Sequence, residues 1–188
     1  MTRISLRVAL LFIVLQLFTT LPTTAADTKA PGMIAPQSQH SDPAPVVNGI
    51  TQATVSAGVL ACASRVNQVA NFLTSGSQGV GAILFTPPAA PDQELVSVSL
   101  EIPMGDGPSA YASASFAPNQ VNGCGSLYET VVFWPATCAE VADKNFGAFK
   151  KIGLLSKTVH MLDGGQLVKI FLMPAGDGCV SIKKEIVQ

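Results

Sequence analysis

The chain has 188 residues and a formal net charge of −1, too little positive charge for a protein that would bind nucleic acid through a basic surface. Charged residues make up 12% of the chain, about half of the roughly 25% usual for a soluble domain. The length and the hydrophobic content of 48% suffice for one domain with a sizeable core. Nucleic acid is therefore not an expected partner, and the surface must be polar mainly through hydroxyl and amide groups.

Residues 1–26 have the order of a cleavable secretory signal peptide. Arg3 and Arg7 precede an apolar stretch at 8–18, and small residues end the segment at Ala26. The apolar stretch is shorter than the roughly 20 residues of a membrane-spanning helix, so we expect no stable membrane insertion after cleavage. Loss of the two arginines takes the net charge from −1 to −3. This segment predicts export to the periplasm or the extracellular space.

Two further regions follow the predicted signal peptide. Residues 27–48 are rich in Pro, Ala, Ser and Gln and have no apolar periodicity, which is typical of a flexible leader. Residues 49–188 carry all the periodic patterns. We expect them to form a single domain.

Two helices are expected in this domain. The first is indicated by apolar residues at alternating steps of four and three, with Thr54 as its N-cap and Gly76 as its stop; the stripe consists of Val55, Val59, Cys62, Val66, Val69 and Leu73. The second helix is expected at 137–149. Thr137 and Glu140 stand three apart there, as in a capping box.

Short apolar or alternating segments bounded by turn residues predict strands. They lie at 80–85, 95–102, 110–116, 127–134, 158–162, 167–173 and 179–187. The expected fold class is α+β, with one antiparallel sheet of six or seven strands and the two helices on one face. The alternating Ser and Ala residues of the second and third strands suit a sheet whose other face is partly wet.

A weak internal duplication is one interpretation of two similar turns. Pro-x-Gly-Asp-Gly occurs at 103–107 and again at 174–178, each time after an apolar strand. A helix followed by three strands would then be used twice. The alternative is that this turn chemistry arose twice independently.

The four cysteines, Cys62, Cys124, Cys138 and Cys179, predict two disulfides in an exported chain. We prefer the pairs Cys62 with Cys124 and Cys138 with Cys179, because each would tie a helix to a strand end. A local bridge between Cys124 and Cys138 ranks second. No Cys-x-x-Cys or zinc-type spacing is present, so neither a redox motif nor a metal site is expected.

Catalytic motifs are weak. His160 is the one histidine of the expected domain, and a nucleophile would need it as base with an acid such as Asp143 or Asp163 to orient it. A free Cys138 at a helix N-terminus would have a reactive thiol. No Gly-x-Ser-x-Gly or phosphate-binding loop occurs, and no cofactor is expected.

Three aromatic residues are candidates for binding. Tyr128 and Trp134 share one face of their expected strand, and Tyr111 projects opposite the alanines of its own strand. Such a platform on an exposed sheet face would suit another exported protein or a glycan, whereas Trp134 buried under a helix is the alternative. The favoured function is an exported non-catalytic interaction module, such as a binding, inhibitor or assembly-accessory protein. The alternative is a small exported hydrolase or thiol enzyme that uses His160 or Cys138.

Overall fold

The structure, a computed structural model, describes residues 47–105 and 107–188. The predicted signal peptide and all but the last two residues of the predicted leader lie outside this part. The elements in chain order are α1 (Gly49–Ser56), α2 (Ala63–Thr74), β1 (Gly81–Phe85), β2 (Val96–Ile102), β3 (Ala110–Asn119), β4 (Gly123–Trp134), α3 (Cys138–Asn145), β5 (Lys150–Leu154), β6 (His160–Asp163), β7 (Val168–Ala175) and β8 (Gly178–Val187).

All eight strands form one sheet, in the order β1-β2-β3-β4-β8-β7-β6-β5, and every neighbouring pair is antiparallel. The expected α+β class with a single antiparallel sheet is confirmed. The described part has eight strands in place of six or seven, and three helices in place of two.

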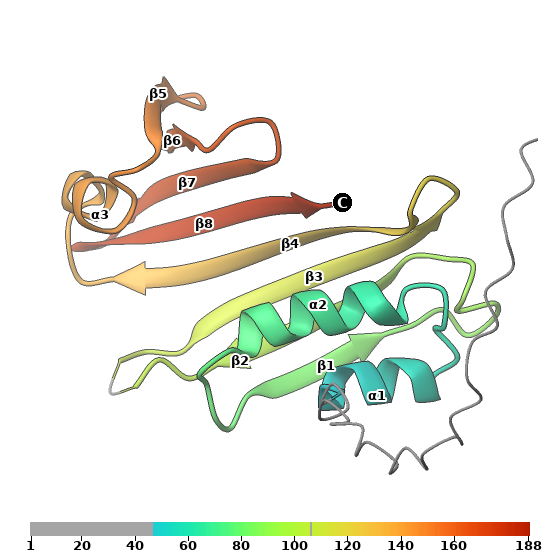
Figure 1. Cartoon of the computed structure of the whole chain (residues 1–188). Helices are drawn as coiled ribbons and strands as arrows, with labels where there is room; N and C mark the ends of the chain where they lie inside the picture. Colours follow the sequence, from blue (N-terminus) through green and yellow to red (C-terminus); the bar gives the residue numbers. More distant parts are fainter. Residues whose placement is uncertain (1–46, 106) are drawn as a thin grey trace, which may run out of the picture. The chain divides into compact units, whose positions relative to one another are not determined.

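Helices α2 and α3 cover one face of this sheet. Directly paired residues of neighbouring strands point to the same side, and Trp134 of β4 pairs with Cys179 of β8. Tyr128, an even number of residues from Trp134, lies in the cluster packed under α2, while Cys179 lies in the cluster under α3. Figure 1 shows α1 and α2 over one half of the sheet and α3 beside the other. We call this side the helix face and the opposite side the open face.

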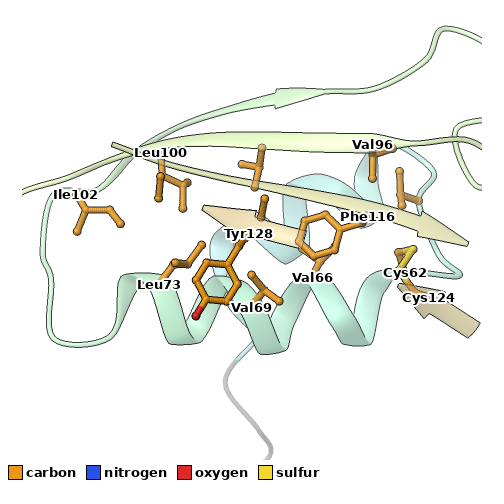
Figure 2. Packing of buried hydrophobic residues seen from close by; sticks show 14 of the residues in the cluster. Cys62, Val66, Val69, Leu73, Val96, Leu100, Ile102, Phe116, Cys124 and Tyr128 are labelled. Atoms are coloured by element: carbon orange, nitrogen blue, oxygen red, sulfur yellow. A yellow bond between two sulfur atoms is a disulfide. The ribbon is translucent and has the colours of Figure 1, made fainter. Parts of the chain in front are cut away.

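The larger core cluster lies between α2 and strands β2–β4. One stripe of α2 faces the sheet in Figure 2, with Val66, Val69 and Leu73 directed at the strands. The strands meet them with alternate residues, so that Leu100 and Phe116 are almost fully buried. The intervening serines of β2 and β3 point to the open face, as their alternation predicted.

A smaller core cluster lies under α3. Its buried members are Cys138, Val141, Ala142, Leu162, Ile170, Leu172 and Cys179. Rings of Trp134, Phe146 and Phe149 pack at its border, with edge-to-face contacts of 6.5 Å and 6.1 Å between ring centroids. Each half of the sheet therefore has its own core.

The single first helix predicted from Thr54 is wrong, because the chain breaks into α1 and α2. Gly58 has a φ of +88°, which ends α1, and Asn48 rather than Thr54 caps it, its side chain accepting a hydrogen bond from the Ile50 N–H at 2.9 Å. The Thr54 hydroxyl instead donates to the Ile50 carbonyl within α1. Of the predicted apolar stripe, Val55 is exposed on α1, whereas Val59 and Cys62, in the connection to α2, are fully buried.

The second helix is shorter than predicted. Its capping box is present, with Thr137 and Glu140 bonded to each other in both directions, but the helix ends at Asn145 and not at 149. The following residues form β5, an edge strand that was not expected. Every residue of β5 is exposed, and its pairing with β6 is irregular between Lys151 and Gly153. The strand therefore has no alternation of buried and exposed residues by which its sequence could be recognised.

The two halves of the sheet repeat one plan. The N-terminal half has α2 and β1–β4, and the C-terminal half has α3 and β5–β8. In each half a cysteine at the start of the helix is bonded to the second residue of the fourth strand. That residue pairs with a proline of the third strand, Pro118 opposite Cys124 and Pro174 opposite Cys179. The repeat is therefore a helix with four strands.

The duplication suggested by the two Pro-x-Gly-Asp-Gly turns matches the wrong parts of the two halves. Residues 103–107 lie between β2 and β3, whereas 174–178 connect β7 to β8, so the two turns are not equivalent. The equivalent of the second turn is the β3–β4 connection, which ends in Gly123 and Cys124 as the β7–β8 turn ends in Gly178 and Cys179.

Both preferred cysteine pairs are present as disulfides. The Sγ atoms are 2.07 Å apart in Cys62–Cys124 and 2.04 Å apart in Cys138–Cys179. The described part of the chain has no free cysteine. Such bonds indicate an oxidising, non-cytoplasmic compartment.

Candidate functional site

The residues proposed for catalysis lie at the C-terminal half of the sheet. His160 is exposed on β6 and lines, with Cys138, a shallow cavity of about 240 Å³. The Cys138 sulfur is bonded to Cys179, so the hypothesis of a free thiol nucleophile is wrong.

The two acids that could orient His160 already have other partners. Asp143 lies 2.6 Å from the Lys151 ammonium, and Asp163 lies 2.7 Å from that of Lys169. A histidine base is normally held by the carboxylate that orients it. Neither carboxylate is hydrogen-bonded to His160 in the part of the chain that the structure describes.

A hydrogen-bonded cluster joins the two halves at the centre of the helix face. Tyr128 of β4 donates from its hydroxyl to the Glu185 carboxylate of β8. Lys183, also on β8, lies 2.8 Å from both the Tyr128 oxygen and the Glu185 carboxylate. We call these three residues the central polar cluster; its members satisfy one another.

The environment of this cluster alters the pKa of each member. Burial and the hydrogen bond to Glu185 raise the pKa of Tyr128. Burial opposes the charged forms of Lys183 and Glu185, but their hydrogen bonds outweigh it, so the pKa of Lys183 is raised and that of Glu185 lowered. The cluster thus holds a neutral phenol, an ammonium and a carboxylate at neutral pH.

A small cavity of about 210 Å³ lies beside this cluster, between α2, Tyr128 in the middle of β4 and the C-terminal end of β8. Phe72 of α2 stands at its edge, 5.5 Å from the Tyr128 ring and 5.6 Å from the Lys183 nitrogen. Of its polar lining groups, Tyr128 and Glu185 are bonded to each other and Gln68 is bonded to Arg65. The volume is below the 300–1,000 Å³ typical of ligand pockets. The arrangement serves mainly to connect the two halves.

The predicted aromatic platform is not formed. Tyr128 is 2% exposed beneath α2, beside Val69 and Leu73 in Figure 2. Trp134 is half-buried and donates from Nε1 to the Ser181 hydroxyl at 2.8 Å. Both side chains point to the helix face, which is the face of β4 that the helices cover. This agrees with the alternative interpretation, in which Trp134 lies under a helix.

Tyr111 alone among the three aromatics lies on the open face. Its side chain is 46% exposed, and its hydroxyl shares a 2.9 Å hydrogen bond with that of Ser99 on β2. The structure therefore separates Tyr111 from Tyr128 and Trp134 by the thickness of the sheet.

The open face carries a broad set of apolar side chains that sequence reasoning missed. The exposed ones are Ile83, Phe85, Tyr111, Leu127, Phe133, Met173 and Ile186, and the half-buried ones are Val131, Phe171, Val180 and Ile182. Apolar residues at successive positions in 131–134 and 170–173 were the available signal, because a strand with apolar residues on both faces loses its alternation.

Charged residues form a row across the middle of this apolar surface, from Glu129 and Lys184 to Lys169 of β7, which pairs with Lys184, and Asp163 of β6, which pairs with Lys169. Glu129 of β4 lies opposite Lys184 of β8, and their charged groups are 2.9 Å apart. Ser113 donates to the same carboxylate at 3.2 Å. The pair is surrounded by Leu127 and Val131 on β4 and by their partners Ile186 and Ile182 on β8.

No group of three or more metal-ligating side chains occurs within 47–105 and 107–188. Across those same residues, no helix has the length and apolar character required to span a membrane. No protein-family model, curated protein or solved structure matches the chain.

Proposed function

We propose that the chain is an exported, non-catalytic interaction module that binds another protein through the open face of its sheet. The observation that carries this proposal is the apolar character of that face on β4, β8 and β7. An antiparallel sheet with one wet face normally alternates apolar and polar residues. Here the second face of three adjacent strands is apolar as well, with Phe133, Met173 and Ile186 exposed.

An exposed apolar surface of this breadth is typical of a protein interaction site. Its composition also fits one, since aromatic residues and methionine are enriched at interfaces. Tyr111 keeps its place as a binding candidate on this face, whereas Tyr128 and Trp134 belong to the packing of the helix face. A thiol enzyme that uses Cys138 is not supported, because the Cys138 sulfur is bonded to Cys179.

Site-specific photocrosslinking in the native cell tests the proposal. Tyr111 is replaced by a photoreactive benzoyl-phenylalanine, and a matched variant carries the same residue at Phe72, which is 60% exposed on α2. We expect a protein adduct from position 111 and none from position 72. Adducts from position 72 alone, an adduct that contains carbohydrate in place of protein, or no adduct at either position would contradict the proposal.

A further inference from the structure

We propose that the partner of the open face is a second copy of this chain, and that the two sheets stack face to face about a two-fold axis parallel to β4 and β8. This inference rests on the proposed function and names its partner. At the centre of this face, β4 and β8 present Glu129 and Lys184, with aliphatic side chains before and after them along both strands.

The charges select one orientation of the second copy. Rotation about an axis parallel to the strands places β4 of one copy over β8 of the other. Glu129 then lies over Lys184 of the second copy, and Lys184 over its Glu129. Rotation about an axis across the strands would place Glu129 over Glu129 and Lys184 over Lys184, and such like charges oppose association. Only the first arrangement is self-complementary.

The apolar residues agree with this orientation. Leu127 pairs with Ile186, and Val131 with Ile182, across the β4–β8 ladder. When β4 of one copy lies over β8 of the other, each of these side chains meets an aliphatic side chain of the second copy. Stacked sheets pack about 10 Å apart with their strands within about 30°. The angle between the strands displaces residues far from the axis most. Residues next to the axis, such as these, still lie over their counterparts in the second copy.

The available area is sufficient for a stable dimer. Strands lie about 4.8 Å apart and rise about 3.4 Å per residue, so six central strands over the length from Leu127 to Phe133 present roughly 700 Å². Two such faces would bury about 1,400 Å² in total, within the roughly 1,200–2,000 Å² buried by stable interfaces. The serines of β2 and β3, including Ser99 and Ser113, flank the apolar centre as a polar border does in known interfaces.

Charge reversal tests the orientation directly. The full mature chain is studied by sedimentation velocity at micromolar concentration, with Glu129→Lys and Lys184→Glu as separate variants. We expect the wild type to have twice the mass of the mature chain, and each variant to dissociate about 100-fold more readily because like charges then face each other. An equimolar mixture of the two variants should form a 1:1 heterodimer, since the Glu129→Lys copy has positive charges at both positions and the Lys184→Glu copy has negative charges at both.

Two controls separate dimer contacts from effects on folding. The double variant Glu129→Lys with Lys184→Glu restores the ion pair within each copy and should be dimeric again. Reversal of the exposed Asp143–Lys151 pair, whose charged atoms are 2.6 Å apart on α3 and β5, should leave the dimer unchanged.

The outcomes distinguish this inference from the proposed function. A monomeric wild type that still gives an adduct to a different protein from position 111 would overturn the second copy and leave the proposed function intact. A monomer without any such adduct would overturn both. A dimer that is insensitive to the charge reversals, or a mixture that fails to form heterodimers, would overturn the stacking of β4 over β8.

Discussion

The N-terminal and C-terminal halves of the sheet share a plan, yet they differ in how they are stabilised. In the N-terminal half, the twelve-residue α2 covers a large cluster that includes Leu100 and Phe116. The C-terminal half has the eight-residue α3, a smaller cluster and a fully exposed edge strand, β5. Because burial of apolar area is the main favourable term in folding, the C-terminal half must depend more on its disulfide.

The open face is not divided at the boundary between the halves. Strands β2 and β3 present serines there, while β4 of the N-terminal half and β8 and β7 of the C-terminal half present large apolar side chains. The apolar outer surface therefore spans the β4–β8 junction between the halves. This contrast is what an interface on β4, β8 and β7 would produce, since apolar surface that a partner covers need not be covered by the chain itself.

The largest expected effect follows removal of the C-terminal disulfide. The change is Cys138→Ala with Cys179→Ala, which opens a loop with a sequence separation of 41 residues and costs about 4 kcal/mol by chain entropy. We expect amide exchange protection to fall on β5–β7 first, while β2 and β3 stay protected. Hydrogen exchange measures this difference between the halves.

The matched control is Cys62→Ala with Cys124→Ala, with a sequence separation of 62 residues. Its entropic cost is also about 4 kcal/mol, but the larger cluster around it should keep the C-terminal strands from unfolding first. Equal loss of protection in both halves for both pairs would remove the distinction.

The same truncation in each core gives the next largest effects. Leu100 and Leu172 are at most 1% exposed, and replacement of such a leucine by alanine costs about 2–5 kcal/mol, depending on how far the surroundings relax. We expect about 4 kcal/mol for Leu100→Ala and about 2.5 kcal/mol for Leu172→Ala, because the smaller cluster collapses more easily. Denaturant unfolding followed by Trp134 fluorescence measures both, and a larger loss for Leu172→Ala would contradict the comparison.

Helix starts differ between the halves and predict smaller effects. The α3 start is stabilised by the Thr137–Glu140 capping box. The turn before α2 depends on Asp92, whose carboxylate accepts from the backbone N–H groups of Leu60 and Ala61 at 2.6 Å and 2.5 Å. Thr137→Ala and Asp92→Ala should each lower the free energy of unfolding by about 1 kcal/mol. Unchanged thermal midpoints for both variants would show that neither contact matters.

The smallest expected effect is a change of pH dependence at the central polar cluster, which joins the halves. Although burial opposes it, hydrogen bonding to Lys183 and Tyr128 lowers the pKa of Glu185. A lowered folded-state pKa adds stability above the unfolded pKa, and that stability is lost as the pH falls through the folded one.

The stability difference between the wild type and Glu185→Gln should therefore be constant above about pH 5 and shrink below about pH 4. Urea unfolding over this pH range measures it. In a Tyr128→Phe background the difference should narrow, because one of the hydrogen bonds is absent. A difference that grows toward acid pH would show that the Glu185 carboxyl is protonated more readily in the folded protein.

Local patterns predicted much of the fold. The alternation in β2 and β3, the capping box of α3 and the buried stripe with Val66, Val69 and Leu73 are properties of neighbouring residues, so a single sequence suffices to detect them. The break between α1 and α2 was missed because the spacing of apolar residues in the sequence continues past Gly58. The positive φ of Gly58 belongs to the turn between the two helices, which this spacing does not reveal.

The open face could not be predicted in the same way. Which side of β4 is covered depends on where α2 and α3 pack, and no periodicity of β4 itself contains that information. The prediction that Tyr128 and Trp134 share one face of their strand was correct. The prediction that this face is exposed was wrong, because it is the helix face. The apolar runs in β4 and β7 did indicate two buried faces, but such a run also fits a sheet covered on both sides by its own chain.

The disulfide connectivity has a consequence for how the protein is made. Cys62 is bonded to Cys124 and Cys138 to Cys179, so each cysteine is joined to its neighbour along the chain. If the chain is exported as proposed, an oxidase that acts as it emerges from a translocation channel would meet the first native pair before Cys138 arrives, and the second pair after it. Sequential oxidation then leads directly to the native bonds, without the reshuffling that takes seconds to hours in chains with interleaved pairs.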